Sequence, residues 1–102
     1  MSDDVQRRLP ELRGRIDALD DVIVSALTER FARALEVGAH KGADVQDNAR
    51  EAEVLAHVES LATELGGDCA AIRATYVRIL QLSREIQRQH AIDGELAPPP
   101  IR

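Results

Sequence analysis

The stretch from Pro10 to Lys41 constrains the fold more than any other part of the chain. Apolar side chains recur there in steps of three, four or seven residues, at Leu12, Ile16, Leu19, Ile23, Leu27, Ala34 and Val37. This spacing places them on one face of an α-helix. A helix of this length is roughly 48 Å long at about 1.5 Å per residue, more than the rest of a 102-residue chain can cover. The stretch therefore predicts a long helix that packs against a second copy of the chain.

Two shorter helices are predicted after the long one, and the sequence has no strand signal. Asp47 or Asn48 can cap the second helix, which Gly66-Gly67 ends. Asp68 can cap the third. The sequence thus predicts an all-α fold of three helices, one long and two shorter, in a homodimer.

The predicted domain boundaries follow from proline and from loss of the apolar pattern. Pro10 suits the first turn of a helix, so residues 1–9 are expected to be an N-terminal extension. Residues 10–92 are the predicted helical domain, with fraying near Ile92. The proline-rich segment 93–102 is predicted to be a disordered tail.

Composition argues against several classes of function. A net charge of −5 and a total of two aromatic residues disfavour nucleic-acid binding. No segment approaches the roughly 20 apolar residues of a membrane span, and the N-terminus lacks the apolar core of a signal peptide. Cys69 is the only cysteine, which favours a reducing compartment, so we expect a cytoplasmic protein. The histidines lack metal-ligand spacing and no Gly-rich phosphate loop occurs, so neither metal nor cofactor is expected.

Four polar side chains lie on helix faces that are otherwise apolar. Arg30 and Lys41 share a face of the long helix about 16 Å apart along its axis, which suits a small anion. Pairing with a carboxylate, or extension into solvent, also explains each of them. Ser83 and Gln87 stand at positions i and i+4 of the third helix's apolar stripe, where an unsatisfied polar group costs about 1 to 3 kcal/mol. An interhelical hydrogen bond and a ligand contact explain this pair equally well.

Four more charged side chains, on the first and second predicted helices, are candidates for a binding site. Asp47, Arg50 and Glu51 lie on one side of the first turn of the second helix, where capping and solvation also explain them. Arg13 precedes Arg30 by roughly 25 Å along the axis and lies about 100° around it. If both serve one small molecule, Arg13 must come from a second subunit, and a solvated helix arginine is the alternative.

In their order along the chain, these segments resemble the all-helical (AroQ-type) chorismate mutases. The resemblance runs from Leu12 to Gln87 through LRGRIDALD with Arg13, LTER with Arg30, EVGAHK with Lys41, VQDNARE with Asp47, Arg50 and Glu51, and LSREIQ with Ser83 and Gln87. It implies an intertwined homodimer of three-helix subunits with two equivalent pockets. It also implies the rearrangement of chorismate to prephenate, a step of the shikimate pathway in aromatic amino-acid biosynthesis.

The resemblance implies that cations and donors surround the substrate. Arg13 of the partner subunit would hold the side-chain carboxylate of chorismate, and Arg30, helped by Ser83, would hold the ring carboxylate. Lys41 and Gln87 would donate hydrogen bonds to the ether oxygen. The implied catalytic residues are Arg30, Lys41 and Gln87.

The second helix would complete the implied site. Asp47 and Glu51 would face the ring hydroxyl of chorismate, and Arg50 would brace the carboxylates around it. An isochorismate pyruvate lyase and a 4-amino-4-deoxychorismate mutase share this scaffold, but Glu51 directly after Arg50 favours chorismate. A non-catalytic helical dimer that serves as a scaffold is the alternative from another class.

Overall fold

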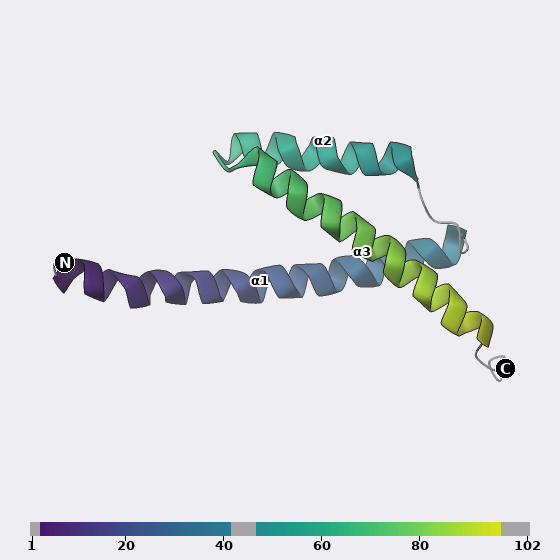
Figure 1. The fold of residues 1–102 in the computed structure, drawn as a ribbon, viewed down its shortest axis with the longest axis horizontal. Coiled ribbons are helices and arrows are strands. Elements are labelled where there is room, and N and C mark those ends of the chain that lie inside the picture. Colours follow the sequence, from purple (N-terminus) through teal and green to yellow (C-terminus); the bar gives the residue numbers. More distant parts are fainter. Residues whose placement is uncertain (1–2, 42–46, 97–102) are drawn as a thin grey trace. The chain divides into compact units, whose positions relative to one another are not determined.

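The structure, a computed structural model, describes the backbone of residues 3–41 and 47–96 and the side chains of residues 5–40 and 47–90. These residues form three α-helices and no strand: α1 (Asp3–Lys41), α2 (Asn48–Glu64) and α3 (Cys69–Leu96), shown in Figure 1. The prediction of an all-α chain with one long and two shorter helices is confirmed. By its internal contacts the chain divides into two units, residues 1–33 and 34–102.

Helix α1 begins at Asp3, so the prediction that it begins near Pro10 was wrong. Pro10 lies inside the helix, where its missing N–H leaves one backbone hydrogen bond unmade. The preceding residues Gln6, Arg7 and Arg8 are good helix formers, and the loss of one bond does not end the helix. The segment 1–9, predicted as an extension, is therefore helical from Asp3 onward.

The first unit carries an apolar stripe along α1. Its side chains follow each other in steps of four and three residues and are all exposed: Val5, Leu9, Leu12, Ile16, Leu19 and Ile23, hereafter the α1 stripe. Ile16 and Leu19 at its centre are 56% and 58% exposed. Contiguous exposed apolar surfaces mark sites of interaction with other molecules. The α1 stripe is therefore a candidate protein–protein interface.

The second unit is built on a hairpin of α2 and α3, which pack against each other (Figure 1). Its buried apolar side chains, among the described residues, are Val58 and Ala62 of α2 with Ile79 and Leu80 of α3. Val58 and Ala62 are four residues apart, which places them on one face of α2, and Ile79 and Leu80 are neighbours on α3. This core is small, so the hairpin depends strongly on how its ends are fixed.

A glycine turn reverses the chain between α2 and α3. Gly66 has φ +70°, a conformation that side chains with a Cβ rarely adopt, and its N–H donates to the carbonyl of Thr63 at 3.1 Å. The N–H of Gly67 donates to the carbonyl of Ala62 at 2.8 Å. Together these bonds form a Schellman cap that ends α2. The turn sends α3 back along α2, toward the start of that helix.

Aspartates begin both helices of the hairpin: Asp68, as the sequence predicts, and Asp47, one of the two caps that the sequence allows. The Asp47 side chain accepts a hydrogen bond from the N–H of Arg50 at 3.0 Å, and Asp68 accepts one from the N–H of Ala71 at 3.0 Å. Each carboxylate thereby satisfies a backbone donor that has no partner inside its helix. The cap of α2 at Asp47 sets where the first turn of that helix lies.

Helix α3 ends at Leu96, so the predictions of fraying near Ile92 and of a tail from residue 93 were wrong in their boundary. Gly94 lies within the helix because a single glycine costs only about 1 kcal/mol there. Residues 97–102, and the predicted loop after Lys41 up to residue 46, lie outside the described residues.

None of these helices, within residues 3–41 and 47–96, has both the length and the hydrophobicity needed to cross a membrane.

Candidate active site

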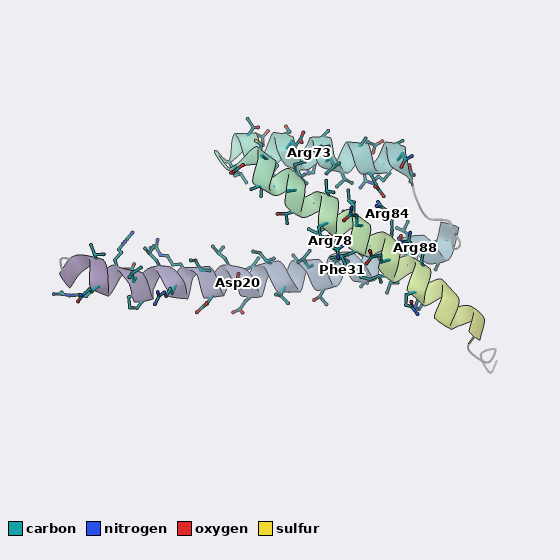
Figure 2. All side chains as sticks on the ribbon, viewed as in Figure 1. Asp20, Phe31, Arg73, Arg78, Arg84 and Arg88 are labelled. Carbon is teal, nitrogen blue, oxygen red and sulfur yellow. The ribbon has the colours of Figure 1, made fainter. Side chains whose placement is uncertain are left out.

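An ion pair joins the first turn of α2 to the middle of α3. The Arg84 Nη1 atom donates to both carboxylate oxygens of Glu51 at 2.5 Å, and the two side chains are only 19% and 23% exposed. Figure 2 shows Arg84 on the side of α3 that faces α2. Glu51 is one of the predicted site residues, and Arg84 is not. The pair fixes the Glu51 carboxylate between the two helices and offsets its charge.

A second contact joins α3 to the end of α1. The Gln87 Nε2 atom donates a hydrogen bond to the carbonyl of Ala34 at 2.6 Å. Gly38 lies over the same side chain, because a Cβ at that position would stand 3.1 Å from the Gln87 Cγ. The amide group of Gln87 has two N–H donors, and anchoring one of them orients the other. We call Ala34, Gly38, Glu51, Arg84 and Gln87 together the three-helix junction.

Ser83 is the buried polar residue next to this junction. Ser83 is only 7% exposed and is the buried polar residue among those that the structure describes. Its hydroxyl donates a hydrogen bond to the carbonyl of Ile79 at 2.9 Å. The expected need for an internal partner is thus met within the residue's own helix. Gln87 finds its partner on another helix, so an interhelical hydrogen bond, one of the two explanations that the sequence left open, is present at Gln87.

Asp47 and Arg50, unlike Glu51, bond to groups within α2. One Asp47 carboxylate oxygen caps α2 by accepting from the N–H of Arg50. The Arg50 guanidinium is 67% exposed and pairs with Glu53 at 3.2 Å. An exposed pair of this kind contributes little stability and exchanges easily, so it leaves the Arg50 side chain able to turn toward another anion.

The remaining predicted site residues are all on α1. Arg13 and Arg30 belong to the first unit, where Arg13 is exposed and Arg30 is half-buried. Lys41 is the last residue of α1, and its side chain lies outside the described residues. Of the predicted set, the three-helix junction therefore contains Glu51 and Gln87, and Ser83 lies on the same segment of α3 as Gln87.

Sequence reasoning missed Arg84. Its signal is its position: it follows Leu80 by four residues and precedes Gln87 by three, so it lies at the edge of the stripe that carries Gln87. Its partner Glu51 is distant in the sequence, and no local pattern links the two. Within the described residues, no three His, Cys, Asp or Glu side chains are grouped so as to hold a metal ion.

Comparison with known proteins assigns the chain to a family. A model of the chorismate mutase type II family matches residues 12–88. Searches of curated proteins and of solved structures gave no match. The matched range includes every side chain predicted for the site, from Arg13 to Gln87, and the three helices fit an all-α family of isomerases. The chain therefore belongs to the chorismate mutase type II family.

Proposed function

We propose that the chain rearranges chorismate to prephenate as a homodimer, in a pocket built by both subunits. In this intramolecular reaction one carbon–oxygen bond breaks as a carbon–carbon bond forms, and neither a nucleophile nor a proton shuttle is needed. The protein has to hold the compact chair conformer and stabilise negative charge that grows on the ether oxygen. The observation that carries the proposal is the family match over residues 12–88.

The exposed α1 stripe supports the homodimer. Burial of this stripe against a second copy would remove a row of aliphatic side chains from water, at about 25 cal/mol per Å² of apolar surface. The small core of the hairpin makes such additional burial important for the fold. A spacing of alternately four and three residues suits side-by-side packing of two helices.

Charges beside the stripe favour an antiparallel pair. Arg15, Val22 and Glu29 recur every seven residues along one edge of the stripe. In an antiparallel pair centred on Val22, Arg15 of one subunit faces Glu29 of the other, and such edge charges set helix orientation. Both already pair within their own helix, at 3.7 Å with Glu11 and 3.2 Å with Arg33, but these exposed pairs are weak and can exchange.

This register also explains why Arg13 belongs to the site. With the centre at Val22, Arg13 of one subunit lies level with Phe31 of the other, one residue from Arg30. A parallel pair would leave Arg13 and Arg30 separated by roughly 25 Å along the axis, as within one chain. Arg13 of one subunit and Arg30 of the other would thus bind the two carboxylates of the same chorismate.

The three-helix junction would place the donors for the ether oxygen. One N–H of Gln87 donates to the carbonyl of Ala34, and its second N–H would donate to the substrate. Lys41, at the end of the same helix α1, would supply the cation beside it. Ser83 would assist Arg30 at the ring carboxylate. These groups act as fixed donors where charge develops, and such groups are strongest in a site from which water is excluded.

The second helix would supply the polar contacts to the ring hydroxyl. Asp47 has one carboxylate oxygen in the helix cap, and Glu51 is held in place from α3. Arg50 would turn from Glu53 to brace the carboxylates. The net charge of −5 repels a dianion, so the local arginines and lysine have to outweigh it at the site. With a single cysteine in the chain, we place this reaction in the cytoplasm.

Three substrates test the proposed reaction. The purified protein is incubated separately with chorismate, isochorismate and 4-amino-4-deoxychorismate, and the products are identified by chromatography. We expect prephenate from chorismate as the fastest conversion. Pyruvate release from isochorismate that exceeds prephenate formation would instead identify a lyase, and turnover of none of the three would favour a scaffold.

Replacement of Gly38 by alanine tests the role of the junction. The added Cβ would stand 3.1 Å from the Gln87 Cγ and 3.4 Å from its Cβ, so Gln87 has to shift and its bond to Ala34 is strained. We expect kcat/KM for chorismate to fall about tenfold with the helical circular dichroism retained. Gly14→Ala is the control, because nothing lies within 4 Å of its added Cβ. Equal activity of the two variants would argue against positioning of Gln87 by Gly38.

A further inference from the structure

We infer that Arg84 is a positioning residue that holds and neutralises Glu51 for substrate binding. The inference rests on the proposed function, because Glu51 matters to the reaction only if it faces the ring hydroxyl of chorismate. Arg84 donates from Nη1 to both Glu51 oxygens across the α2–α3 interface, and both side chains are largely shielded from water. In the interhelical pair Arg73–Glu59, by comparison, the side chains are 51% and 39% exposed.

Charge balance explains why Glu51 needs this partner. Chorismate carries two negative charges, and a carboxylate at the pocket wall repels it unless a cation lies close by. Arg84 supplies that cation at hydrogen-bonding distance from both oxygens. Arg50, one residue before Glu51, pairs with Glu53 instead. Arg84 thus lets Glu51 accept a hydrogen bond from the ring hydroxyl without lowering the affinity for the dianion.

The placement of Arg84 also fixes geometry. It is adjacent to Ser83 and three residues before Gln87, so one short segment of α3 carries all three side chains. The ion pair from this segment to the first turn of α2 would fix the distance between the Glu51 carboxylate and the side chains of Ser83 and Gln87. Loss of the pair would allow the Glu51 side chain to adopt other rotamers, and small displacements of a ligand group reduce catalysis strongly.

A second, more exposed ion pair between α2 and α3 serves as a control. Arg73 of α3 donates to Glu59 of α2 at 3.1 Å, so it joins the same two helices away from the three-helix junction (Figure 2). Arg73→Ala removes an interhelical pair without touching Glu51. An effect that belongs to hairpin stability alone should appear in both variants.

The experiment measures kcat and KM for chorismate in Arg84→Ala, Glu51→Gln, the double variant and Arg73→Ala. We expect Arg84→Ala to raise KM about tenfold with a smaller fall in kcat, because an unneutralised Glu51 then repels the dianion. In the Glu51→Gln background the same change should alter KM less than about twofold, because no carboxylate is left to neutralise. Arg73→Ala should keep both constants within about twofold of the parent.

Three outcomes would overturn the inference. They are an unchanged KM in Arg84→Ala, an equal rise of KM in both Glu51 backgrounds, and an equal rise in Arg73→Ala. If Arg84→Ala does not fold, Arg84→Lys replaces it, because lysine retains the charge with fewer donors. A raised KM in Arg84→Lys together with a parental KM in Arg84→Lys/Glu51→Gln supports the inference. A KM that is raised in both of these variants, or in neither, overturns it.

A readout without substrate separates this inference from the proposed function. Thermal unfolding of Arg84→Ala, Glu51→Ala and the double variant should show coupling between the two positions whether or not chorismate is turned over. If the changes in melting temperature are additive, the two side chains do not interact, and the inference is overturned. Coupled unfolding together with a parent protein that is inactive on chorismate would instead refute the proposed function, and with it the role of Arg84 in substrate binding.

Discussion

Replacement of Arg30 or of Lys41 by alanine is expected to lower kcat/KM for chorismate by several orders of magnitude. Lys41 would stabilise the charge that develops on the ether oxygen as the carbon–oxygen bond breaks, and Arg30 would hold the ring carboxylate and so fix the substrate in its reactive geometry. Because the reaction has no covalent intermediate, electrostatic stabilisation and positioning supply the whole rate enhancement. Absorbance of chorismate followed over time gives kcat and KM for both variants.

The fold should survive both substitutions. Alanine is the best helix former, so the helical circular dichroism should be retained. Arg78→Ala is the control, since Arg78 is 60% exposed on α3 and pairs only loosely with Glu85, at 3.8 Å. It should keep kcat/KM within about twofold of the parent. Activity of Arg30→Ala and Lys41→Ala within tenfold of the parent would mean that neither cation is needed for the reaction.

Mixing two inactive variants is expected to restore activity. In a heterodimer of Arg13→Ala with Arg30→Ala, one pocket receives Arg30 from the first subunit and Arg13 from the second, and is therefore complete. Random pairing makes about half of all dimers mixed, each with one complete pocket out of two, so about one quarter of the parental activity should return. The mixture is prepared by joint refolding, and its activity is compared with that of each variant refolded alone.

A second mixture is the matched control. Arg30 and Lys41 would serve a pocket from the same subunit, so a heterodimer of Arg30→Ala with Lys41→Ala contains no complete pocket. This mixture should stay as inactive as its components. If the Arg13→Ala and Arg30→Ala mixture also stays inactive while native mass spectrometry, with one variant isotopically labelled, shows mixed dimers, Arg13 does not act across the interface.

The ends of the helices show which structural features can be predicted from a few neighbouring residues. Asp47, Asp68 and Gly66 act through bonds to backbone groups a few residues away; the sequence predicts Asp68 and Gly66 and narrows the other cap to Asp47 or Asn48. Pro10 was misread because a proline is compatible both with the first turn and, at the loss of one bond, with the interior of a helix. The outcome depends on the total helix preference of the neighbouring residues.

The candidate site was predictable in part for a similar reason. Ser83 and Gln87 stand out because they interrupt an apolar stripe, and the structure gives each a hydrogen-bond acceptor. Arg84 does not stand out, since an arginine at the edge of a stripe is common on helix surfaces. Its contact with Glu51 depends on the angle at which α2 and α3 pack, which no sequence pattern encodes.

The hydrogen bond of Ser83 affects how this side chain could bind a substrate. A hydroxyl has one proton, and here that proton is directed to the carbonyl of Ile79. A carboxylate docking beside Ser83 has to draw the proton away, while the Ile79 carbonyl keeps the acceptor role that the helix backbone gives it. In the proposed pocket, Ser83 would therefore become a donor only as the carboxylate docks, so the substrate itself would complete the set of donors that binds it.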